Sequence, residues 1–144
     1  MIAIDTNLLV YAHRRESGFH DRASARVAEL VASGSAWAIP WPCLHEFYGV
    51  VTNARAFQPP STIAQASTQI AEWLSSPGLA LIHEGAGHWK ALHGLLVSGR
   101  VSGGQVHDAR IAAICIENGV REFWTADRDF NRFPSLTVRN PLVD

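Results

Sequence analysis

Cysteine is scarce in this sequence, and nothing in it resembles a disulfide framework. The 144 residues include only Cys43 and Cys115. These two residues form no CxxC pair and both lie in apolar surroundings, so we expect two buried free thiols in a reducing cytosol. A chain of this length buries about 68–70% of its surface on folding and needs no disulfide or metal to fold. We therefore expect one domain over residues 1–144.

Long apolar runs and export signals are also lacking. No stretch approaches the ~20 apolar residues that a membrane-spanning helix requires. The apolar N-terminal stretch is broken by Asp5 and Asn7 and has no cationic start, unlike a signal peptide. These absences predict a soluble, cytoplasmic protein that makes no contact with a membrane.

Several common site motifs are missing as well. No GxGxxG follows the first apolar run, which excludes a dinucleotide-binding domain. The segment HEFYG at 45–49 begins like the zinc-protease motif HExxH, but Gly49 stands where the second histidine is required. A phosphoaspartyl phosphatase needs a second acid two residues after the first, and Asn7 occupies that position after Asp5. No GxSxG nucleophile motif is present.

Lysine is nearly absent, although basic residues are not. Lys90 is the one lysine among twelve basic residues, and the other eleven are arginines. Arginine binds phosphate in bidentate fashion, which suits a nucleic-acid ligand. The same bias also arises from genome base composition. The net charge of −1 does not by itself indicate a nucleic-acid-binding protein.

Short apolar runs alternate with helical patterns along the whole chain. The expected strands are residues 1–4, 36–40, 79–83, 121–125 and 136–140, and the expected helices are 7–15, 20–34, 40–53, 61–78, 87–100 and 105–119. Ser61 is the expected N-cap of its helix, Gly34 and Gly119 the expected stops, and 102–104 a flexible segment. This alternation predicts an α/β sandwich with a central, mostly parallel sheet of four to five strands.

Acidic residues fall where the expected strands end. Asp5 follows the first strand, and Asp127 and Asp129 follow the strand at 121–125. In parallel sheets, ligands bind beyond these carboxyl ends. Asp108 lies in the first turn of its helix, and Glu46 lies in the helix after the second strand.

Each acid also has an ordinary structural interpretation. Asp5 suits an N-cap, Asp108 suits the positive end of a helix, and Asp127 and Asp129 suit a turn. Glu46 points away from the apolar stripe of its helix, so periodicity predicts that it faces solvent. Together, however, clustered carboxylates repel one another, and a divalent cation removes that repulsion. An all-carboxylate set indicates Mg²⁺ or Mn²⁺ rather than zinc.

Four segments in order, 1–12, 44–53, 107–120 and 125–133, resemble a PIN domain, and most of all the VapC-type toxin ribonucleases of bacterial toxin–antitoxin pairs. The resemblance covers residues 1 to about 134. It implies an α/β/α sandwich, usually a homodimer, that cleaves RNA with Mg²⁺ or Mn²⁺ and leaves a 5′-phosphate and a 3′-hydroxyl. It also implies inhibition by a small VapB-like antitoxin. The alternative is a catalytically inactive PIN-like RNA-binding or scaffold protein.

The resemblance assigns roles to individual positions. The catalytic acids it implies are Asp5, Glu46, Asp108 and Asp127, and the metal ligands are Asp5, Asp108, Asp127 and Asp129. The supporting polar residues are Thr6, Asn7 and Thr125. Separately, arginines that flank the motifs are candidates for RNA phosphate contacts: Arg14, Arg15, Arg110, Arg128 and Arg132.

Overall fold

A computed structural model describes residues 1–143, and a five-stranded sheet forms its middle layer. The strands lie in the order β3-β2-β1-β4-β5, and every pairing between neighbours is parallel. Their bounds are β1 Ile2–Ile4, β2 Trp37–Pro40, β3 Leu79–Ile82, β4 Glu122–Trp124 and β5 Val138–Arg139. The predicted α/β fold with its parallel sheet is confirmed.

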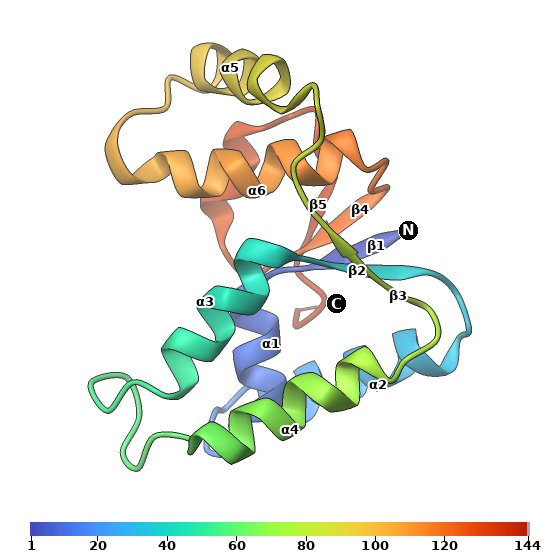
Figure 1. The fold of residues 1–144 in the computed structure, drawn as a ribbon, viewed down its shortest axis with the longest axis vertical. Helices are drawn as coiled ribbons and strands as arrows, with labels where there is room; N and C mark the ends of the chain where they lie inside the picture. The colour runs from blue at the N-terminus through green and yellow to red at the C-terminus, as the bar shows by residue number, and fades with distance from the viewer. Residues whose placement is uncertain (144) are drawn as a thin grey trace.

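Helices cover both faces of the sheet (Figure 1). On one side lie α1 (Thr6–His13), α2 (His20–Ala32), α3 (Trp41–Val51) and α4 (Ile63–Leu74), and on the other lie α5 (His88–Ser98) and α6 (Val106–Glu117). The chain steps from β1 to β2 to β3 in one direction and then crosses back to β4. Because such crossovers are right-handed, the reversal places α5 and α6 on the opposite face. The result is an α/β/α sandwich.

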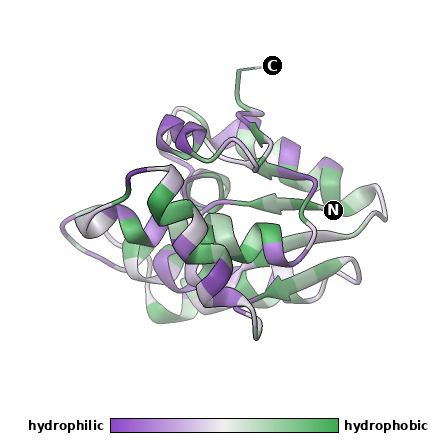
Figure 2. Cartoon of the chain, turned by 90° about the horizontal axis from the view of Figure 1, so that it is seen from above, coloured by the Kyte–Doolittle hydropathy of each residue, from purple (hydrophilic) through white to green (hydrophobic). Residues whose placement is uncertain are grey.

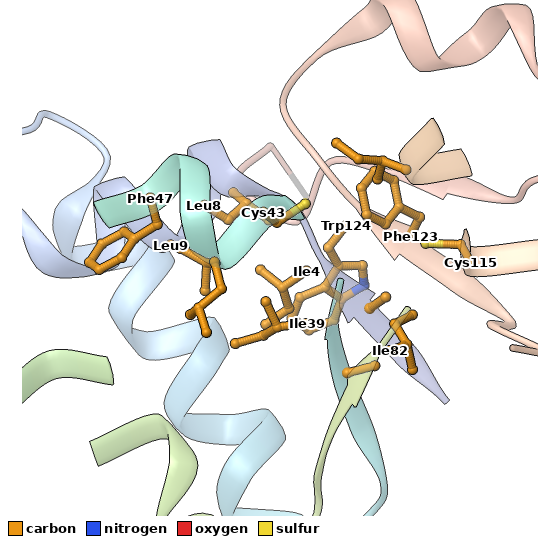
Figure 3. Packing of buried hydrophobic residues seen from close by; sticks show 14 of the residues in the cluster. Ile4, Leu8, Leu9, Ile39, Cys43, Phe47, Ile82, Cys115, Phe123 and Trp124 are labelled. Atoms are coloured by element: carbon orange, nitrogen blue, oxygen red, sulfur yellow. The ribbon is translucent and has the colours of Figure 1, made fainter. Parts of the chain in front are cut away.

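The core lies on both sides of the central strands. In Figure 2 the strands are mostly hydrophobic, and Figure 3 shows Ile4 next to Ile39. Ile82 is paired with Pro40, so it extends from the opposite face of the sheet to Ile39. Helix α6 buries a wide face, which comprises Ala109, Ile111, Ala112, Ala113, Ile114 and Cys115. Complete burial of one isoleucine side chain contributes about 1.5–3 kcal/mol. This packing holds the strand ends, and therefore the acids behind them, in fixed positions.

All six predicted helices form, although α1 ends at His13 rather than Arg15 and α4 ends at Leu74, before the expected stop at 77–78. Two further details also differ from the expected ends and loops. Gly34 and Gly119 adopt the left-handed conformation just past α2 and α6, with φ of 70° and 68°. The N-cap of α4, however, is Thr62 rather than the expected Ser61, and Thr62 forms a capping box with Gln65. Gly103 and Gly104, part of the segment 102–104 that was expected to be flexible, form a 3₁₀ helix with Gln105, η1 (Gly103–Gln105). A second 3₁₀ helix, η2 (Arg128–Arg132), follows β4.

Both cysteines are fully buried, as expected from their apolar neighbours. Burial raises the pKa of the Cys115 thiol and of the Cys43 thiol well above the ordinary value. Both sulfurs therefore stay protonated at neutral pH. Within residues 1–143, no helix combines the length and the apolar character needed to cross a membrane.

Candidate active site

The acids meet where the strand order reverses. β1 pairs with β4, but after β1 the chain turns away toward β2, so the two loops beyond β1 and β4 diverge. Asp5 is the first residue past β1 and Thr125 the first past β4. The backbone N–H of Asp5 donates to the carbonyl of Trp124 at 3.0 Å, which holds the two strand ends together. Such a switch point is where ligands bind in open parallel sheets.

Asp5 is a buried carboxylate, with 5% of its surface exposed. Its Oδ1 accepts from the Thr6 N–H at 2.7 Å and lies 3.5 Å from the Cys43 thiol. Its Oδ2 accepts from the Thr125 hydroxyl at 2.7 Å and from the Asn7 amide at 3.2 Å. Burial outweighs these donors and raises the pKa of Asp5 from 3.8 to about 6. The site therefore favours a positive charge next to Asp5.

Thr125 links the two halves of the site. Besides donating to Asp5, its hydroxyl accepts from the Asn7 amide at 3.0 Å and from the Asp127 N–H at 2.9 Å. The side-chain oxygen of Asn7 accepts in turn from the Ala126 N–H at 3.2 Å. Thr125 is 1% exposed, so these bonds are shielded from water. The predicted supporting residues Asn7 and Thr125 thus connect the loop after β1 to the loop after β4.

A cluster of three carboxylates belongs to the same site and is formed by Asp108, Asp127 and Asp129. One carboxylate oxygen from each lies within 4.8 Å of the others. Asp127 caps η2, because its Oδ1 accepts from the Asp129 N–H at 2.9 Å. Burial raises the pKa of Asp108, and the negative charges of Asp127 and Asp129 raise it further. These three carboxylates repel one another unless a cation lies between them.

Glu46 reaches the same place from α3. Its side chain is exposed overall, as the helical pattern predicts. Its carboxylate nevertheless accepts from the Thr6 hydroxyl at 3.3 Å, and its negative charge raises the pKa of Asp5. Glu46 is therefore exposed to the cavity of the site rather than to the outer surface of the protein. Thr6 therefore contacts both Glu46 and Asp5.

These carboxylates line one cavity of about 270 Å³, which we call the carboxylate cavity. Its acids are Asp5, Glu46, Asp108 and Asp127, and its apolar wall includes Val10 and Ile111. Asp129 is not part of this lining and lies at the rim, against Asp108 and Asp127. Because the ionised ligands are all carboxylate oxygens, the donor set fits a hard divalent cation such as Mg²⁺ or Mn²⁺.

A larger cavity of about 690 Å³ lies between the end of α1 and the start of α4. Its central polar groups bind one another: the His13 ring and the Arg14 guanidinium contact the Ser61 hydroxyl at 2.9 and 3.0 Å. It contains no cluster of carboxylates comparable to the carboxylate cavity. Size alone therefore does not identify the site of chemistry here.

Arg14 does not suit the predicted role in RNA binding. Its side chain is 12% exposed, pairs with Glu16 and donates to the carbonyl of Pro59 at 2.8 Å. Its guanidinium also lies over the Phe57 ring, 4.5 Å from the centroid. Arg14 thus fastens the loop after α3 to the end of α1, because each of its three guanidinium nitrogens already has a partner in the fold.

The other arginines predicted to contact RNA differ in their solvent exposure and in their ion pairs. Arg110 pairs with Glu84 at 2.5 Å and is half exposed. Arg15 and Arg128 are exposed, and the positive charge of Arg132 lowers the pKa of Asp108. Arg128 follows Asp127 directly in the chain and lines a neighbouring cavity rather than the carboxylate cavity itself.

Sequence reasoning missed one contributor to the site. Cys43 was interpreted only as a buried thiol, yet its sulfur lies 3.5 Å from Asp5 Oδ1. The backbone carbonyl of Cys43 also lies 3.5 Å from the Thr6 hydroxyl. The sequence does indicate that Cys43 lies near the site, since it is one helical turn before Glu46 on the same helix. That spacing alone does not assign Cys43 to the site, because a buried cysteine is common in any core.

The fold and the acidic cavity define a class, and comparison with known families agrees. The model of the PIN domain family matches residues 2–136. This chain therefore belongs to the PIN domain family.

Individual relatives are more specific than the family. Ribonuclease VapC43 of Mycobacterium tuberculosis is 32% identical over 142 residues, which cover 99% of this chain and 96% of the relative. Ribonuclease VapC33 of the same organism is 33% identical, with 99% of each chain covered. The resemblance to VapC-type ribonucleases is therefore confirmed over the full length.

Solved structures give the same grouping. A crystal structure of VapBC2 from Rickettsia felis, bound to a DNA fragment from their promoter, contains a chain that is 26% identical to this one. The match has a TM-score of 0.70 and covers 97% of this chain and 98% of that one. Mycobacterium tuberculosis VapC20, a toxin that cleaves the sarcin–ricin loop, is similar in fold, with a TM-score of 0.67 at 18% identity.

Proposed function

We propose that this protein is a divalent-metal-dependent endoribonuclease and the toxin of a VapBC toxin–antitoxin pair. The observation that carries the proposal is the carboxylate cavity, in which Asp5, Glu46, Asp108 and Asp127 meet at the switch point of a PIN domain. The full-length relatives are named ribonucleases. No observation favours the catalytically inactive alternative, since every predicted acid is retained and all lie in or beside the cavity.

Asp5, Asp108, Asp127 and Asp129 would hold the metal, with Glu46 facing it across the cavity. A bound divalent cation supplies an activated water for attack on phosphorus and offsets charge on the leaving oxygen. The chain itself contributes orientation. Thr125 and Asn7 hold Asp5 Oδ2, Thr6 holds Asp5 Oδ1 and Glu46, and η2 presents Asp127 and Asp129 together.

Removing the metal is expected to stop the reaction. Cleavage of an end-labelled single-stranded RNA should occur with Mg²⁺ or Mn²⁺, disappear with excess EDTA, and return when the metal is restored. The reason is that the clustered carboxylates alone offer water no activation and repel a phosphodiester. Denaturing gels report the rate, and end analysis should find a 5′-phosphate. Undiminished cleavage in EDTA would contradict the metal assignment.

Replacing Thr125 tests the link between the two loops. Thr125→Val keeps the shape but removes the hydroxyl that binds Asp5, Asn7 and Asp127. Outer partners of metal ligands typically contribute 10–100-fold, so we expect cleavage to fall by about that factor. The unpaired Asp127 N–H should also lower the free energy of unfolding by about 1–3 kcal/mol. Thr125→Ser keeps the hydroxyl and is the control; equal rates for the two variants would exclude the linking role.

The charge distribution is compatible with an RNA substrate. With the five site acids neutralised by metal, eight acidic residues remain against twelve basic ones. Exposed Arg15 and Arg128 can contact phosphates, which gives affinity without sequence reading. The VapBC structures among the neighbours support a VapB-like antitoxin as partner. We further propose a single cytoplasmic domain that forms a homodimer.

A further inference from the structure

A second cavity adjoins the carboxylate cavity on the β5 side. It has a volume of about 270 Å³, and we call it the side cavity. Asp127 lines both cavities, and the side cavity also includes Thr125 and Ala126. Its remaining walls come from η2 and from β5 with the segment after it: Arg128, Asn131, Val138, Asn140 and Val143. A nucleotide whose phosphate lies at the acids thus has a place for its neighbour next to Asp127.

The chemistry of the side cavity differs from that of its neighbour. Beyond Asp127 it offers a guanidinium, two side-chain amides and two aliphatic side chains. That set does not suit a metal. It suits a flat heterocycle, because proteins read unpaired RNA bases by packing against their faces and bonding to their edges. The valines can supply the packing, and Asn131, Asn140 and Arg128 the edge contacts.

Asn140 gives the side cavity a preference in hydrogen bonding. Its side-chain oxygen accepts from the Leu142 N–H at 3.0 Å. What Asn140 offers a ligand is therefore its NH₂ group, and Arg128 can only donate. Donors favour bases that present keto oxygens, as arginine favours guanine O6 and N7. Adenine and cytosine also carry ring acceptors, but at the edge position where guanine O6 or uracil O4 accepts they present an amino group, which cannot accept from these donors.

The walls of the side cavity are held in place by the core. Phe130 of η2 is 1% exposed and packs against Phe123 of β4, with ring centroids 4.9 Å apart. The Thr125 N–H donates to the carbonyl of Arg139 at 3.0 Å, which fixes β5 beside the loop after β4. Because its walls are built from anchored elements, the cavity can discriminate between bases without first ordering itself.

We propose that the side cavity binds the unpaired base adjacent to the scissile phosphate and selects guanine or uracil through donation from Asn140 and Arg128. The inference rests on the proposed nuclease function and names the residues that would determine which base is preferred beside the cut. A side chain that donates correctly to one base and not another discriminates by about tenfold. Cleavage should therefore show a preference of that size at one position beside the cut.

The decisive variant is Asn140→Asp, which keeps an oxygen for the Leu142 N–H but replaces the NH₂ donor by a second acceptor. Wild type and variant are given a single-stranded RNA pool with all four bases at each position, and the ends of the products are sequenced. Wild type should favour guanine or uracil at one position next to the cut, and Asn140→Asp should shift that preference toward adenine or cytosine. An unchanged base ratio would overturn the proposal, whatever happens to the overall rate.

Further variants and a binding assay distinguish failure of the base-site proposal from failure of the nuclease proposal. Arg121→Ala is the control, because Arg121 is exposed and lies at the end of β4 away from the side cavity; this variant should show the same base preference as wild type. Arg128→Ala removes one of the two proposed donors and should reduce the preference for guanine or uracil. If wild type cuts nothing, the nuclease proposal fails by itself; the side cavity is then tested by fluorescence anisotropy with short RNAs that differ in one base. Equal binding of all four by wild type, or cleavage without any preference beside the cut, would exclude the side cavity as a base site. Asn131→Ala replaces Asn140→Asp if circular dichroism shows that the latter does not fold.

Discussion

Asp108→Asn is expected to lower the rate of RNA cleavage by more than about a hundredfold, which is the upper end of what partners of metal ligands contribute. Asp108 lines the carboxylate cavity and also belongs to the cluster with Asp127 and Asp129. The asparagine is nearly the same size but carries no charge, so the site loses attraction for the cation and one of its ligands. The fold should survive, because the raised pKa of Asp108 shows that its charge is unfavourable in the metal-free protein.

Asp21→Asn is a matched control for this change. Asp21 is exposed and lies in the first turn of α2, as Asp108 lies in the first turn of α6. Both substitutions remove the same favourable interaction with a helix N-terminus, about 0.3–1 kcal/mol. Initial rates on a labelled RNA, at saturating metal, should therefore be normal for Asp21→Asn. Full activity of Asp108→Asn, or an equal loss in both variants, would remove Asp108 from the catalytic set.

Without metal, the burial of Asp5 is expected to cost the protein about 3 kcal/mol of folding free energy at neutral pH. The pKa of Asp5 is about 6 in the folded chain against an ordinary 3.8. Between these two values the folded protein holds a proton that the unfolded chain has released. Stability therefore falls as pH rises through this window, and above about pH 6 the loss is complete.

Urea unfolding in EDTA at several pH values, with wild type and Asp5→Asn, isolates this contribution. The asparagine cannot ionise, so the difference in unfolding free energy between the variant and wild type should grow by about 2 kcal/mol from pH 4 to pH 7. Added Mg²⁺ should then stabilise wild type and not the variant at neutral pH. Two curves that stay parallel over the whole range would show that Asp5 does not titrate in this window.

The fold could be predicted because its strands and helices have different periodicities and clear stops. Gly34 and Gly119 lie where a left-handed residue ends a helix. The error at Ser61 has a tertiary cause: Ser61 and Thr62 are both good caps, but Ser61 is bound by His13 and Arg14 of a distant segment. No local pattern contains that information.

Only some of the site residues could be placed from the sequence. Asp5 and Asp127 follow from strand ends, since parallel strands bring their carboxyl ends to one edge. The place of Glu46 depends on how α3 packs against α1, which carries Thr6, and periodicity reports only that Glu46 is not in the core. The partners of Arg14 could not be predicted, because the loop through Pro59 folds back onto it, and loop conformation cannot be read from local preference.

The Thr125 hydroxyl donates to Asp5 and accepts from Asn7, and these two hydrogen bonds join residues about 120 positions apart. During synthesis, the first part of the site emerges long before its second part exists. Until the loop after β4 has been translated and β4 has inserted beside β1, Asp5 lacks its partner and the aspartate cluster lacks two of its three members. A nascent chain is therefore harmless to the RNAs that surround it, and the activity appears only when the domain closes.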